Sequence, residues 1–152
     1  MRNAVVVDSG PLIALFDRDD AHHKRVLAFI TAHPRLRLVT TWAVLNETSA
    51  LLGARAGKQA EIDCLIWVER GGVVIANQDA ASFAHMRSLI EKYRALPFNF
   101  ADASVAVLAE QSGVSQIMTL NRDFEVYKDS HGKRLKNMLL LTVARARSSS
   151  NG

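Results

Sequence analysis

Residues 4–16 read Ala-Val-Val-Val-Asp-Ser-Gly-Pro-Leu-Ile-Ala-Leu-Phe, and this stretch decides the fold. Its four opening residues are apolar with no polar alternation, which is typical of a strand buried on both faces of a parallel sheet. Asp8 follows where that strand ends, and Ser-Gly-Pro then favours a turn with proline at the first position of a helix. Asp8 is therefore predicted at the carboxyl edge of the sheet, where open α/β folds build their sites. The alternative is an Asp that only caps the turn.

Short apolar runs alternate with helical patterns along the rest of the chain. This alternation predicts an α/β fold with a mainly parallel sheet of four to five strands. The adjacent His22 and His23 point about 100° apart on a helix, so they are interpreted as solvated side chains. Further strands are expected at residues 36–39, 73–76, 115–120 and 138–143, and helices at residues 42–55 and 58–70, with two more ending near residues 93 and 113.

Length and composition narrow the possibilities. A chain of 152 residues fits one domain, expected over residues 1–144, with a flexible basic tail at residues 145–152. The single cysteine, Cys64, excludes an internal disulfide and a cysteine-based zinc cluster. With no signal-peptide pattern and no apolar run near 20 residues, we expect a cytoplasmic protein without a membrane segment. The net charge of +4 is compatible with a nucleic-acid partner.

Glu47 is a second acid of interest, because of its place in the predicted helix at residues 42–55. Val44 and Leu51 lie three residues before it and four after it, so Glu47 projects from the apolar stripe. A carboxylate turned towards a core is costly unless it is paired or bound to a metal. The alternative is a Glu at the edge of the stripe that reaches solvent or an arginine.

Asp102 is a third acid, at the start of a predicted helix. Apolar residues follow it at the third, fourth and seventh positions, so Asp102 is expected in the first turn and on the inner face. The alternative is an Asp that only complements the helix dipole. A similar pattern recurs at residues 115–120, where a short apolar run leads into Asn121 and Asp123.

These oxygen-bearing side chains are expected to converge, because a parallel α/β fold brings strand ends and helix starts to one edge. Carboxylates gathered in this way repel one another unless cations are bound. Mg²⁺ or Mn²⁺ would resolve that conflict and could activate water against a phosphodiester. The residues alone therefore predict metal-dependent phosphodiester hydrolysis.

Four stretches resemble the acidic motifs of PIN-domain ribonucleases, and most closely those of VapC-type toxins from bacterial toxin–antitoxin pairs. They are residues 5–16, the Asn-Glu within residues 45–48, Phe-Ala-Asp-Ala-Ser at 100–104, and Met-Thr-Leu-Asn-Arg-Asp-Phe at 118–124. The resemblance spans nearly the whole chain, in order and spacing. It implies a PIN-like three-layer α/β/α fold and an endoribonuclease that uses Mg²⁺ or Mn²⁺.

The resemblance also assigns roles to residues. Asp8, Glu47 and Asp102 become metal-binding catalytic acids. The fourth motif departs from the family, which usually has an acid where this chain has Asn121, so either Asn121 supplies a carbonyl oxygen or Asp123 substitutes as ligand and catalytic acid. Related sequences also often carry Asp at the positions of Ala95 and Asn99. One metal ion rather than two is therefore an open alternative.

By the same resemblance, the partners are an RNA substrate, a small antitoxin that blocks the acidic site, and a second copy in a homodimer. The alternative function is a degenerate PIN domain that binds RNA or an antitoxin without cleavage. A haloacid-dehalogenase-like phosphotransferase is disfavoured because it needs an acid at Gly10, and a P-loop protein because the Gly-x-x-x-x-Gly-Lys-Ser/Thr run is absent. The candidate phosphate contacts are Arg94, Arg122, Lys128, Lys133 and Arg134.

Overall fold

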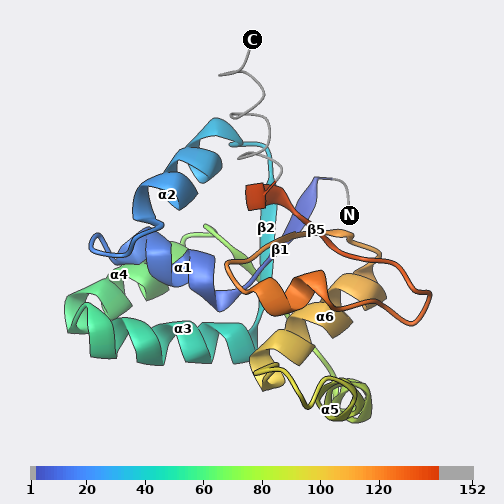
Figure 1. Ribbon diagram of the computed structural model, residues 1–152. Helices are drawn as coiled ribbons and strands as arrows, with labels where there is room; N and C mark the ends of the chain where they lie inside the picture. The colour runs from blue at the N-terminus through green and yellow to red at the C-terminus, as the bar shows by residue number, and fades with distance from the viewer. Residues whose placement is uncertain (1–2, 141–152) are drawn as a thin grey trace.

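The computed structural model describes residues 3–140 and contains, within them, one five-stranded sheet (Figure 1). All four strand pairings are parallel, as the alternating pattern predicts. The strands are β1 (Ala4–Val7), β2 (Arg37–Thr41), β3 (Val74–Ala76), β4 (Gln116–Met118) and β5 (Lys136–Asn137), and their order across the sheet is β3-β2-β1-β4-β5.

Helices cover both faces of this sheet, which gives the expected three layers. Figure 1 shows the four helices of the N-terminal half on one side of the sheet and the last two α-helices on the other. None of the helices within residues 3–140 is both long and apolar enough to cross a membrane. The helices are α1 (Ser9–Phe16), α2 (His23–Ala32), α3 (Trp42–Arg55), α4 (Lys58–Glu69), α5 (Phe83–Lys92) and α6 (Phe100–Ser112), with short 3₁₀ turns η1 (Ala80–Ser82) and η2 (Arg122–Glu125).

The central strand is β1, and its position explains why its sequence is wholly apolar. Val5 pairs with Leu38 of β2 on one side, and Val6 pairs with Ile117 of β4 on the other. All four β1 side chains are buried because helices lie over both faces. The chain leaves β1 towards β2 and later returns on the opposite side as β4. The strand order therefore reverses beside β1, and a crevice forms there at the carboxyl ends of the strands.

Local capping fixes where the helices next to that crevice begin and end. The Thr41 hydroxyl accepts the Val44 N–H at 3.0 Å, so α3 begins directly where β2 ends. Helix α6 begins with a reciprocal pair between Asn99 and Asp102 and ends at Gly113, whose φ of 68° is the left-handed conformation that glycine adopts readily. The polar residues that cap these helices therefore lie at the sheet edge.

The prediction of a strand at residues 138–143 is wrong for residues 138–140, the part of this range that the structure describes. The last strand is only Lys136–Asn137, and the backbone is helical from Met138 to Leu140. The Asn137 side-chain oxygen accepts the Leu139 N–H at 3.3 Å and so caps a turn instead of continuing the strand. A short apolar run does not by itself distinguish a strand from a helix. The predicted tail at residues 145–152 lies outside the described residues.

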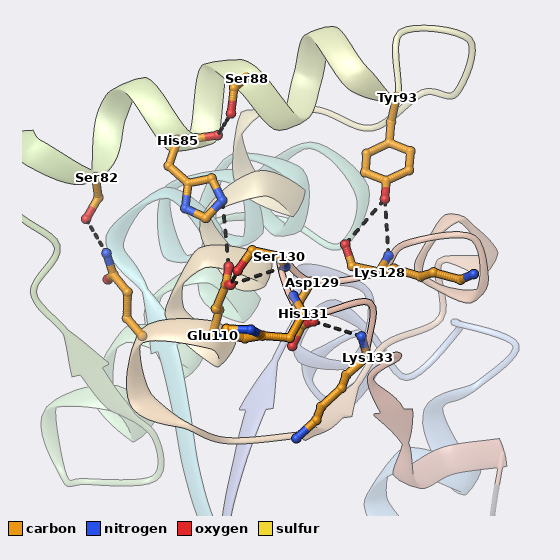
Figure 2. Close-up of polar contacts among 11 residues, drawn as sticks. Ser82, His85, Ser88, Tyr93, Glu110, Lys128, Asp129, Ser130, His131 and Lys133 are labelled. Carbon is orange, nitrogen blue, oxygen red and sulfur yellow. Dashed lines mark hydrogen bonds and ion pairs between the residues drawn. The ribbon is translucent and has the colours of Figure 1, made fainter.

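The loop that follows η2 is tied to both helices of the second layer (Figure 2). Glu110 of α6 accepts the N–H of Ser130 at 3.2 Å, and its other carboxylate oxygen lies 3.6 Å from Nε2 of His85 on α5. The hydroxyl of Tyr93, just after α5, accepts the N–H of Lys128 at 3.1 Å. These contacts hold residues 128–133 over α6.

Candidate active site

Asp8 lies at the end of β1 and is almost completely enclosed, with 2% of its surface exposed. One carboxylate oxygen accepts the Ser9 N–H at 2.8 Å, so Asp8 also caps α1. The other accepts the Thr119 hydroxyl at 2.8 Å. Burial raises the pKa of Asp8 above its ordinary value of 3.8; the two hydrogen bonds lower it, and the charge of Glu47 raises it further. Asp8 is thus held rigidly but at a cost in desolvation.

Asp102 is the third residue of α6 and is 5% exposed. Its Oδ2 accepts the Asn99 N–H at 2.8 Å, while its own N–H donates to the Asn99 side chain at 3.0 Å. Burial raises the pKa of Asp102 to about 7; the Asn99 hydrogen bond opposes this rise, and the charges of Asp8 and Glu47 add to it. The charge of Glu47 acts on Asp8, and the charges of Asp8 and Glu47 act on Asp102, as expected of carboxylates that lie near one another.

Glu47 reaches the same place from α3 and is half-buried, so the prediction that it leaves the wet face of its helix holds. Its Oε1 accepts an N–H of the Asn99 side-chain amide at 3.0 Å. Asn99 therefore contacts two acids at once, because its backbone N–H holds Asp102 and its side chain holds Glu47.

Asn121 holds Asp102 from the opposite side. Its side-chain oxygen accepts the Asp123 N–H at 2.9 Å and caps η2. This bond fixes the orientation of the amide, so that the amino group faces the Asp102 carboxylate at 3.4 Å. In this arrangement the Asn121 amino group faces Asp102, and the Asn121 oxygen, which has two lone pairs, keeps one of them beyond the cap.

The acids open onto a cavity of about 270 Å³ at the carboxyl edge of the sheet. Within residues 3–140, none of the three carboxylates forms an ion pair with a lysine, arginine or histidine. Their charges are therefore offset only by hydrogen-bond donors, and the cavity has room for a cation and water. Its walls are formed by Asp8, Ser9, Gly10, Glu47, Pro97, Asn99, Asp102, Leu120 and Asn121.

Asp123 is placed differently from the other predicted ligands. It is half-buried in η2 and is not one of the residues that line the acid cavity. Of the predicted ligands, the structure therefore brings Asp8, Glu47, Asp102 and Asn121 together, and Asp123 contributes its backbone N–H to the turn beside them.

The predicted phosphate contacts do not form one cluster. Arg122 is exposed and directly follows Asn121, which lines the acid cavity. Lys133 and Arg134 instead line a cavity with Gly113 and Ser115, which follow α6 and precede β4, so they lie towards the amino ends of the strands. Lys128 and Lys133 belong to the loop that packs on α5 and α6 (Figure 2).

Two residues of the site have structural roles that the sequence pattern does not reveal. Thr119 is 2% exposed and bonds Asp8, although it follows β4 near the other end of the chain. Asn99 precedes α6, and the sequence pattern singles it out only as a position where related sequences often carry Asp. A hydroxyl or amide at the end of a buried strand or at a helix cap, next to predicted acids, is the signal that points to both.

Comparison with known proteins places this chain among characterised relatives. The family model described as the PIN domain matches residues 5–129. Ribonuclease VapC26 of Mycobacterium tuberculosis (strain ATCC 25618 / H37Rv) is 29% identical over 118 residues, which cover 78% of this chain and 87% of that protein.

Solved structures share the fold. The crystal structure of Mycobacterium tuberculosis VapC20, described as a sarcin-ricin loop cleaving toxin, has a TM-score of 0.73 at 20% identity and covers 80% of this chain and 93% of its own. The crystal structure of VapBC2 from Rickettsia felis, bound to a DNA fragment from its promoter, has a TM-score of 0.61 at 12% identity and covers 81% and 92%.

Proposed function

The chain belongs to the PIN domain family, and from this premise we propose that it is a metal-dependent endoribonuclease that acts as the toxin of a toxin–antitoxin pair. The sequence likeness to a ribonuclease and the structural likeness to an RNA-cleaving toxin support the proposal. The reaction is hydrolysis of a phosphodiester, in which one water is consumed and the RNA is left with a phosphate monoester and a hydroxyl at the break.

One observation carries the proposal: Asp8 and Asp102 are buried beside Glu47 with no cation from the described part of the chain to neutralise them. Burying carboxylates near one another is costly, and a structural role would be filled more cheaply by neutral residues. Acids kept in this arrangement indicate a site that works with a bound positive charge.

The residues present fit a hard divalent ion such as Mg²⁺ or Mn²⁺. Carboxylate oxygens are the ligands that these ions prefer. Within residues 3–140, no three His, Cys, Asp or Glu side chains lie close enough to hold an ion by themselves. Mg²⁺ is usually bound through one or two carboxylates and keeps several waters, so two of these acids would be enough to hold it. When bound, the ion would supply an activated water and stabilise the charge that develops on the phosphate.

The chain's own groups fix the acids for this task. Ser9 and Thr119 each hold one oxygen of Asp8, and Asn99 and Asn121 hold the two oxygens of Asp102. An ionised carboxylate has about four lone-pair positions, so each acid keeps acceptor capacity towards the cavity. These donors orient the acids without neutralising them, which is the support that a precise ligand arrangement needs.

Protein partners are part of the proposal. We infer a cognate antitoxin and a homodimer, and exposed aromatic side chains support such contacts. Trp42 and Phe83 are 60% and 59% exposed, and Phe100 packs near Phe83 with ring centroids 6.0 Å apart. Exposed apolar groups gathered in this way are typical of protein–protein surfaces. Light scattering of the purified chain tests the homodimer. Light scattering of the chain co-expressed with the product of the adjacent gene tests the antitoxin.

The deciding experiment is cleavage of a cellular RNA pool by the purified protein, with Mg²⁺ or Mn²⁺ and with chelator. Asp8→Asn should abolish cleavage, because it removes a ligand charge while keeping the shape and fold. Asp19→Asn is the matched control, since Asp19 is exposed and is not one of the residues that line the acid cavity. Metal-dependent cleavage that is lost only in Asp8→Asn supports the enzyme. Folded protein that binds RNA without cutting it, whatever the metal, would favour the degenerate binding domain.

A further inference from the structure

A second cavity, of about 400 Å³, adjoins the acid cavity; we call it the basic cavity. The two share Leu120 and Asn121 as walls. Thr119, whose hydroxyl bonds Asp8, also lines the basic cavity. A chain-like substrate lying in the acid cavity can therefore continue directly into the basic one.

Three cationic or protonatable side chains from two elements face this cavity. His22 and Arg25 come from the start of α2, and Arg122 comes from η2. Glu125 is the one acid among the residues that line it, and it is exposed. The remaining walls are apolar or neutral. The basic cavity thus has the opposite charge character to its neighbour.

Arg25 is the residue that points to a ligand. Its Nε is buried and has no hydrogen-bond partner within residues 3–140, and its guanidinium forms no ion pair there. Leaving a buried donor of a charged group without a hydrogen-bond partner is costly. A guanidinium presents donors in a planar fork that matches the oxygens of a phosphate. Nε itself is enclosed, so a phosphodiester oxygen in the cavity that Arg25 lines would pair with the terminal N–H groups of the fork.

We propose that the basic cavity binds a phosphate of the RNA that flanks the scissile one, with Arg25 as the main contact and Arg122 and His22 beside it. This inference rests on the proposed function, because it assumes RNA in the acid cavity. RNA is favoured over an acidic peptide because the phosphates of one strand can occupy the basic cavity and the metal-loaded acids at the same time. His22 then has a role beyond the solvated side chain that the sequence pattern predicts.

The test measures RNA binding separately from cleavage. Fluorescence anisotropy with a short fluorescein-labelled single-stranded RNA, in chelator, gives affinities over a range of KCl concentrations. Arg25→Gln should weaken binding about tenfold, since a hydrogen bond to a charged group is lost. It should also lower the slope of log affinity against log salt by about 0.7, the value for one phosphate contact on a single strand. Lys24→Gln, on the neighbouring exposed residue, should change neither.

Several outcomes would overturn the inference. Equal affinities and slopes for Arg25→Gln and the wild type would remove Arg25 from the RNA site. If Arg25→Gln weakened the binding of an acidic peptide but not the binding of RNA, the cavity would be assigned to a protein partner. If Arg25→Gln unfolds early in a thermal melt, RNA with single methylphosphonate linkages gives the same test on the wild type. Neutralising one particular phosphate should cost about tenfold, whereas a small uniform loss at every position contradicts the proposal.

The two proposals fail in distinguishable ways. Metal-dependent cleavage together with Arg25-independent RNA binding would support the nuclease proposal and refute the phosphate site. Arg25-dependent RNA binding by a protein that never cleaves RNA would refute the nuclease proposal and support the RNA contact. Calorimetry with inorganic pyrophosphate tests a further case. If the protein bound pyrophosphate in an Arg25-dependent way but bound no RNA, the assignment of the cavity to RNA would be overturned.

Discussion

Thr119 donates its hydroxyl to Asp8 over 2.8 Å, although 111 positions separate them in the sequence. The bond joins the carboxyl ends of β1 and β4, the two strands between which the strand order reverses. Thr119 also accepts the N–H of Asn121 at 2.9 Å. One hydroxyl therefore links the first acid to the residue that holds Asp102, and its removal should disturb both sides of the cavity.

Thr119→Val tests this link. Valine has nearly the volume of threonine but no hydroxyl, so the fold should persist while Asp8 loses a donor and the Asn121 N–H loses an acceptor. We expect about a tenfold drop in metal-dependent RNA cleavage, the usual scale for a lost hydrogen bond to a charged group. Initial rates at matched metal concentrations measure it. Thr119→Ser, which keeps the hydroxyl, should retain most of the rate; equal rates for the valine and serine variants would show that the bond is not needed.

Asn121→Asp should strengthen binding of Mn²⁺, because it replaces an amide donor by a charged oxygen ligand beside Asp102. In the absence of metal, the same change should lower the melting temperature through repulsion of nearby acids. Isothermal titration calorimetry reports affinity and the number of ions bound. Asn46→Asp, which adds the same charge on the exposed side of α3, controls for net charge. Unchanged affinity and stoichiometry would place residue 121 outside the metal shell.

The metal-free protein should lose stability as the pH rises towards neutrality. Burial raises the pKa of Asp102 from 3.8 to about 7, so the folded state favours the protonated carboxyl. A raised pKa contributes stability that is fully present below about 4 and is lost as the pH rises through about 7. Asp8 acts in the same direction, since burial raises its pKa too.

Thermal melts in chelator across this pH range measure the effect. Asp102→Asn should flatten the profile, because its amide does not titrate. A melting temperature that climbs between pH 4 and pH 7 in the wild type, with no flattening in Asp102→Asn, would contradict the assignment. Acids whose pKa is lowered, such as the half-buried Asp129, affect stability only below this range.

Gly72→Ala should destabilise the fold without touching the site. A Cβ at this position would lie 2.1 Å from Cε2 of Trp67, whose ring packs edge-on against Phe16 with centroids 5.4 Å apart. We expect a loss of about 1–3 kcal/mol in the free energy of unfolding, the scale of overpacking. Urea denaturation measures it. In a Trp67→Ala background the same substitution should cost much less, so additive losses would argue against the clash.

The parts of this site that could be predicted from sequence are those with a local signal. The unbroken apolar run before Asp8 indicates a buried strand end, and helical spacing places Glu47 and Asp102 on inner faces. Each of these inferences needs only the residues within one or two turns. The acid cavity accordingly contains the three acids that the periodicity singles out.

The parts that could not be predicted depend on contacts between distant segments. Whether Asn121 offers its oxygen or its amino group is decided by the N–H of Asp123 and the carboxylate of Asp102. The apolar residues after Asn137 fit a strand or a helix equally well until the Asn137 side chain caps the turn. Arg25 gives no sequence signal at all, because the lack of a partner for its Nε is visible only in three dimensions.

The 111-position separation between Asp8 and Thr119 has a consequence for synthesis of the protein. The ribosome makes β1, Glu47 and all of α3 early, yet Asp8 gains its second donor only after β4 has been made and has paired beside β1. Pairings between such distant segments form late in folding, because the intervening chain must first be ordered. A chain whose translation stops before residue 119 therefore carries all three acids but lacks Thr119 and Asn121, the donors that hold Asp8 and Asp102. For a protein proposed to cut RNA, an unfinished copy would therefore lack the contacts that orient its acids.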